Sequence, residues 1–148
     1  MKIERTTSAH PGFIALVRHL DVYLAQIDGV EHAFYAQYNK IAALQNVVVA
    51  MGGDVPIGCG AFKPFDDRTV EVKRMYVLPV WRGKGVAGQV LSALEAWAAE
   101  LGYHRCVLET GLRMPDAIGF YEKNGYGRIA NFGQYAGVEN SVCFEKSV

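Results

Sequence analysis

The stretch EVKRMYVLPVWRGKGVAG, from Glu71 to Gly88, contains the pattern that decides the fold. Its first half is typical of a β-strand, its middle is rich in glycine, and its end begins a helical pattern. Small residues at the start of a helix leave backbone N–H groups accessible, and the helix dipole adds partial positive charge there. This strand, turn and helix therefore predict an anion site that suits the phosphates of a nucleotide-like cofactor.

The glycine spacing in this stretch also fits a second kind of site. Gly83, Gly85 and Gly88 match the G-x-G-x-x-G spacing of dinucleotide-binding proteins. That motif should follow the first strand of a repeated βαβ pattern, whereas here it follows strand-like runs that are typical of consecutive hairpins. Only about sixty residues follow Gly88, too few for a second mononucleotide-binding half. The position of the motif argues against dinucleotide binding.

Three short motifs follow one another from residue 75 onward. MYVLP at 75–79 precedes R-x-x-G-x-A, which begins at Arg82, and RCVLET at 105–110 and AIGFYEKNGYGRI at 117–129 come later. In order and spacing they resemble the motifs of the GNAT superfamily of acetyl-CoA-dependent N-acetyltransferases. The resemblance covers the chain from about residue 47 onward.

The resemblance implies a fold and a cofactor. The implied fold is a single N-acetyltransferase domain over residues 1–148, in the mixed α/β class, with a mostly antiparallel sheet, one parallel strand pair at the cofactor cleft and about four flanking helices. The implied acetyl donor is acetyl-CoA, with its pyrophosphate at the turn and its pantetheine arm along the preceding strand. The cofactor-binding residues implied in this way are Met75, Tyr76, Val77, Arg82, Gly83, Lys84, Gly85, Val86, Ala87, Gly88 and Thr110.

Acetyl transfer to an amine needs a base for the amine and a donor for the oxyanion. Glu71 precedes Met75 by four residues, the spacing that some family members show for a general-base glutamate. We therefore expect Glu71 to be the base; the alternative is a solvated strand carboxylate, which Lys73 on the same strand face would keep charged. The backbone N–H of Val77 is the expected oxyanion donor.

The departing thiolate also needs a proton, and Tyr121 is the expected general acid. It lies in FYEKNGY at 120–126, which matches the family motif whose tyrosine hydroxyl points at the coenzyme A sulfur. A phenol with a pKa of about 10 stays protonated at neutral pH and can donate to a thiolate as it forms. The alternative is an ordinary core aromatic on an amphipathic helix.

Two features of the cofactor motifs leave alternatives open. Arg82 and Lys84 suit phosphate contacts, but basic residues at a helix start can also be merely solvated. Many relatives carry an asparagine three residues before the alanine that corresponds to Ala117, and this chain has Met114 there. Thr110 is a candidate replacement for the missing polar group, or else it caps the end of its strand.

Periodicity and turn residues predict the order of elements along the whole chain. Gly29 should separate the first two helices, and Gly102 should end the helix that follows Lys84. That helix should connect two parallel strands. The expected elements are a strand at 1–7, helices at 11–27 and 31–44, antiparallel strands at 47–51, 55–63 and 69–77, a helix to about 101, a strand at 104–109, a helix at 115–123, and a final pair of strands around a loop at 131–140.

Composition limits the class of protein and its partners. The 148 residues, 51% of them hydrophobic, suit one domain with a normal core. Fifteen basic and fifteen acidic residues, without a basic run, argue against nucleic acid. The four histidines show no metal-ligand spacing, so we expect no metal. An N-terminus without an apolar signal region, and apolar runs too short for a membrane span, favour a cytoplasmic protein that does not enter membranes.

The three cysteines, Cys59, Cys106 and Cys143, are odd in number and lie in strand-like stretches, where a small apolar residue fits. We expect reduced core thiols. None of them has a base beside it in the sequence, so we also expect no acyl-enzyme.

The acceptor is the open question of the sequence. We expect direct transfer to a primary amine of a small molecule or an amino-acid-like acceptor. A protein or peptide acetyltransferase, and an acyl-CoA-binding regulatory module without catalysis, remain alternatives, and a homodimer is left open. The acceptor pocket should come from residues 11–45 and the loop at 131–140. HAFYAQY at 32–38 is a candidate lining or ordinary core, and Tyr135 is a candidate acceptor contact.

Overall fold

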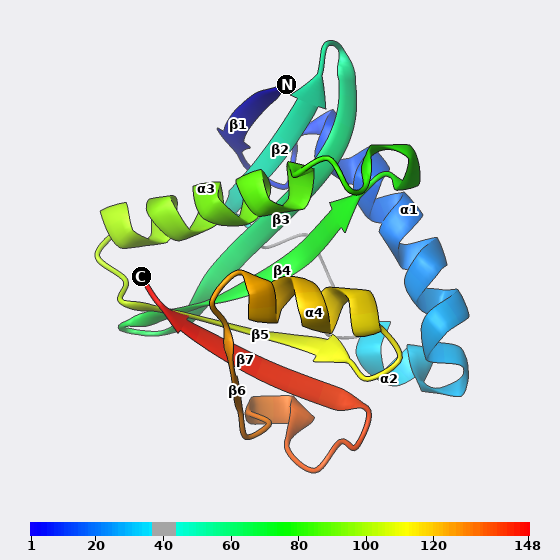
Figure 1. Ribbon diagram of the computed structural model, residues 1–148, viewed down its shortest axis with the longest axis vertical. Helices are drawn as coiled ribbons and strands as arrows, with labels where there is room; N and C mark the ends of the chain where they lie inside the picture. Colours follow the sequence, from blue (N-terminus) through cyan, green and yellow to red (C-terminus); the bar gives the residue numbers. More distant parts are fainter. Residues whose placement is uncertain (37–43) are drawn as a thin grey trace.

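The computed structural model describes residues 1–36 and 44–148. Within these residues, seven strands form one sheet in the order β1-β2-β3-β4-β5-β7-β6, and only the β4–β5 pair is parallel. Helices α3 and α4 lie on one face of the sheet and α1 lies on the other (Figure 1). The elements are β1 (Lys2–Thr6), α1 (Pro11–Asp28), η1 (Gly29–Glu31), α2 (His32–Ala36), β2 (Asn46–Gly52), β3 (Val55–Asp66), β4 (Thr69–Val77), η2 (Pro79–Trp81), α3 (Val86–Glu100), β5 (Arg105–Gly111), α4 (Pro115–Lys123), β6 (Gly127–Ile129), η3 (Gly133–Tyr135) and β7 (Ser141–Ser147).

This architecture confirms the predicted fold class, with a mostly antiparallel sheet, one parallel pair and four α-helices among the described residues. The predicted helix at 31–44 falls in large part on residues 37–43, which lie outside the described part of the chain. Within the described residues, Glu31 belongs to the 3₁₀ turn η1, α2 covers His32–Ala36, and Leu44 is not helical. The first helix does end before Gly29, whose φ of 56° is one that glycine adopts readily.

Alternating residues of the central strands supply two hydrophobic layers. In β2, Val48 and Ala50 pack on the α3 side, whereas Val47 and Val49 pack on the α1 side. This alternation follows from the two-residue period of a strand. Gly58 in β3 lets α3 approach closely, because a Cβ atom there would lie 2.7 Å from Cγ1 of Val86. Helices therefore cover both faces of the sheet. Among the described residues, no helix is long and apolar enough to cross a membrane.

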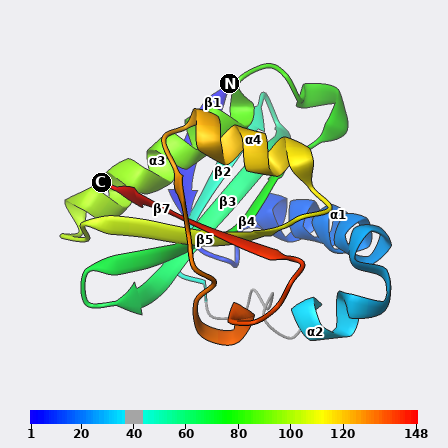
Figure 2. The ribbon, with the colours of Figure 1, turned by 60° about the horizontal axis from the view of Figure 1, so that its bottom comes forward.

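The parallel pair separates after a few residues. β4 and β5 pair only between Thr69–Glu71 and residues 105–107, although β4 continues to Val77 and β5 to Gly111. A register shift against β3 accompanies Arg74, which has a φ of 60°, so β4 carries a bulge at this point. β5 keeps its other edge paired with β7. Figure 2 shows the two strands diverging toward their carboxyl ends.

Candidate functional site

A cavity of about 140 Å³ lies between the diverging ends of β4 and β5. We call it the central cavity. α1, α2, α4 and η3 supply the rest of its wall, so segments from both ends of the chain meet there. Its lining consists of Leu20, Leu24, Asp28, Tyr35, Glu71, Val72, Lys73, Arg74, Met75, Glu109, Thr110, Gly111, Met114, Ala117, Tyr121 and Tyr135.

Glu71, the predicted base, is one of the carboxylates in this cavity. It is only 4% exposed, which excludes a solvated strand carboxylate. Its oxygens lie 3.7 Å from Nζ of Lys73 and 3.9 Å from Nζ of Lys63. Burial lowers the pKa of Lys73, and the charge of Glu71 opposes that effect. The ion pair suggested by the shared strand face is therefore present, inside the cavity.

Tyr121, the predicted acid, reaches the same cavity from α4. The residue is 8% exposed, and its ring packs against Tyr126 and Phe144, with centroids 5.7 and 6.2 Å away. Its hydroxyl makes no hydrogen bond to any residue that the structure describes. Burial, reinforced by the charge of Glu109, raises the pKa of this phenol far above its ordinary value. Tyr121 is thus both a core aromatic and a protonated donor at the cavity.

Glu109 is a site residue that the sequence analysis did not single out. It stands near the end of β5, and Ser141 Oγ donates a 2.7 Å hydrogen bond to its Oε2. Burial raises the pKa of Glu109 to about 7, while the hydrogen bond from Ser141 and the charge of Lys73 act in the opposite direction. The one signal in the sequence was an acidic residue in the motif RCVLET, directly after an apolar run.

The predicted cofactor turn has the required open backbone. Gly83 and Gly85 have φ angles of 75° and 82°, and Gly85 is the N-cap of α3, where it brings no side chain to the first turn. Apart from the adjoining residues and the backbone of its own helix, a Cβ atom at Gly83, Gly85 or Gly88 would have no protein atom within 4 Å. Val86, by contrast, buries its side chain in the core, so only its backbone faces the turn. Ala87 is partly buried beside it.

Arg82 and Lys84 are not merely solvated. Arg82 Nε donates a 3.0 Å hydrogen bond to the carbonyl oxygen of Val77, and its guanidinium lies 5.5 Å from the ring centroid of Tyr76. Lys84 Nζ lies 5.3 Å from the ring centroid of Trp81. These contacts hold two positive charges beside the start of α3. Contact of either residue with a phosphate stays a prediction.

The N–H and C=O of Val77 lie at the edge of β4 that faces away from β3. Leu78 N donates to Ile57 O across the β3–β4 pair, so the next pair, Gly58 and Val77, is of the type without mutual hydrogen bonds. The N–H and C=O of Val77 therefore point away from β3. The C=O accepts the hydrogen bond from Arg82 Nε, and the N–H points toward the side from which β5 has separated. This orientation suits the oxyanion and pantetheine roles predicted for Val77.

The side-chain contacts of three other predicted cofactor-binding residues, Met75, Tyr76 and Thr110, limit what each could contribute to a cofactor site. Met75 lines the cavity, whereas Tyr76 packs on the α1 side of the sheet and offers the cofactor side only its backbone. Thr110 Oγ1 donates to Met114 Sδ at 3.9 Å. Thr110, the candidate replacement for the missing asparagine, thus directs its hydroxyl toward Met114, the residue that stands where relatives have the asparagine.

Both candidate acceptor tyrosines belong to the cavity wall. Tyr35, from the run at 32–38, and Tyr135, from the late loop, stack with centroids 6.5 Å apart and an interplanar angle of 25°. Both side chains are buried, so each tyrosine is a core residue and also part of the cavity wall. Tyr38 lies outside the described residues.

The cysteines are free and buried, as expected. Burial raises the pKa of Cys59 to about 12 and the pKa values of Cys106 and Cys143 to about 11. Thiols with such pKa values are poor nucleophiles at neutral pH. Within the described ranges, no group of three or more His, Cys, Asp or Glu side chains could hold a metal ion.

Comparisons with known proteins agree with this geometry. Residues 15–126 match the sequence model of the Acetyltransferase (GNAT) family. The IAA acetyltransferase of Azospirillum brasilense is 29% identical, over 97% of this chain and 95% of its own length. A Klebsiella pneumoniae protein assigned to the acyl-CoA N-acyltransferases has a similar structure, with a TM-score of 0.82 and 28% identity over 99% of this chain and 96% of that chain.

A GNAT acetyltransferase of Elizabethkingia anophelis, solved with acetyl-CoA bound, has the same fold. Its TM-score is 0.72 at 21% identity, over 99% of this chain and 97% of that chain. The family match covers the turn at the start of α3, the cavity carboxylates and Tyr121. This chain therefore belongs to the GNAT family of N-acetyltransferases, enzymes that take their acetyl group from acetyl-CoA.

Proposed function

We propose that this enzyme transfers the acetyl group of acetyl-CoA directly to the primary amine of a small molecule or an amino-acid-like acceptor. The observation that carries this proposal is the central cavity, whose wall beside the diverging strands includes Glu71, Glu109 and Tyr121. A cavity of about 140 Å³ suits a compact acceptor. The three buried free thiols support a cytoplasmic location.

The residues present fit acetyl-CoA, which supplies an electrophilic thioester. The open N-terminus of α3, with Gly83 and Gly85, would hold the pyrophosphate through backbone N–H groups. Arg82 and Lys84 would add charge there. The free edge of β4 would hold the pantetheine arm, and the N–H of Val77 would stabilise negative charge on the acetyl oxygen.

The carboxyl groups of Glu71 and Glu109 suit different tasks. An acceptor arrives as an ammonium ion and must lose a proton before its nitrogen can attack. Glu109, with a pKa of about 7, is poised to take that proton at neutral pH, directly or through a water molecule. Glu71 is held by two lysines, so we assign it the second role of attracting the ammonium group and orienting it. Glu71 remains the alternative base.

Tyr121 completes the transfer in this scheme. When the C–S bond breaks, the electron pair goes to sulfur, and the Tyr121 hydroxyl donates its proton to the thiolate. The acetyl carbon then carries a new bond to nitrogen, and a free thiol leaves. The proton taken from the amine by Glu109 can return to Tyr121 through the cavity, where the two side chains are close enough for the charge of one to raise the pKa of the other.

Free thiol release tests the function. Purified protein would be mixed with acetyl-CoA and a panel of amino acids, polyamines, aminoglycosides and basic peptides. We expect acceptor-dependent thiol release with small amines, and Tyr121→Phe should suppress it. Tyr126→Phe is the matched control, because it removes a buried phenol hydroxyl that bonds to Glu95 outside the cavity. Binding without turnover over the whole panel would favour a regulatory module, and turnover of peptides alone would contradict a small-molecule acceptor.

A further inference from the structure

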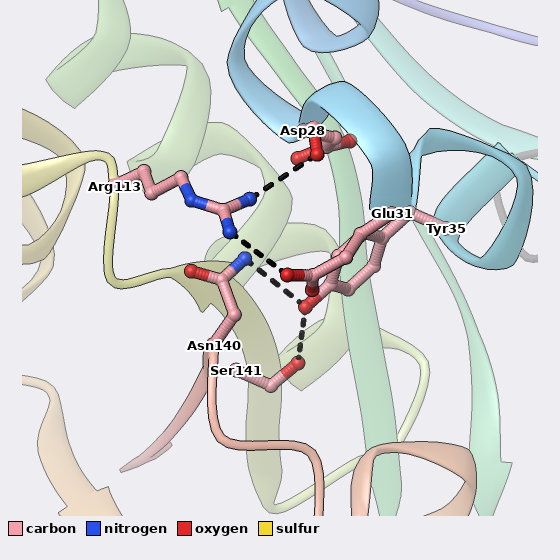
Figure 3. A network of polar contacts seen from close by, with 6 residues as sticks. All are labelled: Asp28, Glu31, Tyr35, Arg113, Asn140 and Ser141. Atoms are coloured by element: carbon pink, nitrogen blue, oxygen red, sulfur yellow. Dashed lines mark hydrogen bonds and ion pairs between the residues drawn. The ribbon is translucent and has the colours of Figure 1, made fainter.

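A chain of three hydrogen bonds leads from the surface of the fold to Glu109. Asn140 Nδ2 lies 3.2 Å from the Tyr35 hydroxyl, and the hydroxyls of Tyr35 and Ser141 lie 3.1 Å apart (Figure 3). Ser141 Oγ lies 2.7 Å from Oε2 of Glu109. The chain joins α2, β7 and β5, with Tyr35 and Ser141 separated by 106 residues in sequence.

Donor and acceptor chemistry gives this chain a direction. Ser141 has one hydroxyl hydrogen, and its bond to the carboxylate of Glu109 uses it. Ser141 Oγ must then accept from Tyr35, whose own oxygen accepts from the amide of Asn140. All three hydrogens therefore point toward Glu109. Such a chain favours the ionised carboxylate, because each bond polarises the next.

The backbone that carries Tyr35 is tied to the opposite side of the cavity. Arg113, which follows β5, donates from Nη1 to the carbonyl oxygen of Asp28 at 3.2 Å and from Nη2 to Glu31 at 2.8 Å. Figure 3 shows these contacts beside the Tyr35–Asn140–Ser141 cluster. Because Asp28 ends α1 and Glu31 ends η1, the clamp restrains the segment just before α2.

We propose that Tyr35 and Ser141 are positioning residues for Glu109, which hold its carboxyl group at the central cavity through the directed chain from Asn140. The proposal rests on the function proposed above, since it concerns the group assigned there as the proton acceptor. In this proposal α2 does more than form part of the cavity wall, because its Tyr35 sets the orientation and the charge state of Glu109.

The remaining groups around Glu109 come from five elements. Lys73 favours its ionised form, whereas Asp28 and Glu71 oppose it. Two tyrosines also face it, and the charge of Glu109 raises the pKa of each. The charge of Glu109 also raises the pKa of Cys143, its partner residue in β7. These neighbours are Glu71 and Lys73 from β4, Asp28 from α1, Tyr121 from α4, Tyr135 from η3 and Cys143 from β7. Variants at Ser141 and Tyr35 leave all of them in place, which isolates the hydrogen-bond chain.

Carbon-13 NMR of the glutamate carboxyl groups tests the proposal without a substrate. Glu109→Gln would identify the Glu109 resonance in uniformly labelled protein. We expect its titration midpoint to rise in Ser141→Ala, because the ionised form loses a donor, and to rise less in Tyr35→Phe. Ser141→Thr, which keeps a hydroxyl, should restore the wild-type midpoint, and Tyr126→Phe should not change it. An unchanged midpoint in both Ser141→Ala and Tyr35→Phe would overturn the proposal.

Kinetics separate this proposal from the assignment of the base. The pH–rate profile would be measured with the panel amine that has the highest kcat/KM. In each variant, the midpoint of the acid limb should rise together with the NMR midpoint. At a pH below the midpoint, a rise of one pH unit in the midpoint should lower the rate about tenfold. If Glu109→Gln keeps the wild-type rate and acid limb, the base assignment fails, whatever the NMR result. If Glu109→Gln removes the limb while Ser141→Ala and Tyr35→Phe leave it in place, only the positioning roles fail. Thermal unfolding would verify that each variant is folded.

Discussion

At the scale of single residues, the cavity carboxylates Glu71 and Glu109 differ in their surroundings. The positive charges of Lys63 and Lys73 lie beside the carboxylate of Glu71. For Glu109 the largest effect is burial, which raises its pKa to about 7. A base must be ionised to act, so kcat/KM should fall as pH decreases through about 7. Glu109→Gln should remove this dependence and lower kcat by about a hundredfold or more. A pH–rate profile of both proteins tests it, and an unchanged acid limb in Glu109→Gln would return the role to Glu71.

The same shift in pKa predicts a change in stability. The folded protein binds the Glu109 proton more tightly than the unfolded chain, where a glutamate pKa is about 4.3. Ionisation of Glu109 therefore costs stability above about pH 7, and this cost disappears as pH falls below the unfolded value. Glu109→Gln should be more stable than wild type at pH 8, on the order of 1–3 kcal/mol, and the gap should close near pH 4. Urea unfolding at the two pH values measures it.

Tyr121 should matter for chemistry more than for cofactor binding. Its hydroxyl makes no hydrogen bond within the described residues, so Tyr121→Phe breaks none among them. We expect kcat to fall by about a hundredfold or more, with little change in the Kd of acetyl-CoA. Single-turnover rates and calorimetric titration separate the two quantities. Equal turnover in the variant would remove Tyr121 from the mechanism.

The cysteines should be dispensable for catalysis. Their pKa values of about 11 to 12 leave almost no thiolate at neutral pH, and direct transfer needs none. A variant with Cys59, Cys106 and Cys143 all replaced by alanine should lose some stability, because each side chain is fully buried, but should keep most of its kcat. Circular dichroism verifies the fold before turnover is measured. Near-complete loss of activity in the folded triple variant would indicate an acyl-enzyme.

At the scale of elements, α3 offers a matched pair of glycines. Gly85 precedes its first turn with φ of 82°, and Gly102 follows its last turn with φ of 94°. Apart from the adjoining residues, a Cβ atom at either would have no protein atom within 4 Å. Alanine at either position should cost about 1–2 kcal/mol, because φ is positive. Only Gly85→Ala should also weaken acetyl-CoA binding, since its Cβ would occupy the space above the helix N-terminus. Calorimetric Kd values test this, and equal losses in both variants would contradict a phosphate site there.

The bulge in β4 is the element-scale cause of the central cavity. Without the extra residue at Arg74, regular pairing of β4 with β5 could continue past Glu71 and would close the space between them. The alternating strand pattern at 69–77 contained no sign of this irregularity, because Arg74 is neither glycine nor asparagine, the usual residues at positive φ. The prediction that Glu71, Lys73 and Met75 share one side is therefore wrong for Met75. Lys73 pairs with Ala61, which packs on the α1 side, whereas Met75 lies beyond the bulge and packs on the α3 side, although all three residues line the cavity.

At the scale of the whole molecule, acetyl-CoA should stabilise the fold. The turn before α3, the edge of β4 and α4 come from separate parts of the chain, so an unfolded chain cannot bind the cofactor at all of them. At a hundredfold excess over Kd, binding adds about 2.7 kcal/mol, which is roughly 5–10 °C in Tm for a domain of this size. Differential scanning calorimetry at several acetyl-CoA concentrations measures it, with adenosine as the control ligand. A Tm that does not change with acetyl-CoA concentration would contradict the proposed site.

The sequence by itself determined the local features of this protein. Glycine and proline positions and apolar spacing predicted the cofactor turn, the end of α3 at Gly102 and the exact span of α4 at 115–123, because these depend on backbone preferences and on contacts within a few residues. The motif around Tyr121 likewise located a residue that does line the cavity. The family and its acetyl donor followed from such local motifs.

Only the tertiary structure decided the features that depend on distant segments. It placed β7 between β5 and β6, opened the cavity between β4 and β5, and brought Tyr35 to Ser141. It also gave Glu109 its unusual pKa, since that value depends on how deeply other segments bury the carboxyl group. Long-range strand pairing and burial are properties of the assembled chain, and a pattern of neighbouring residues does not contain them.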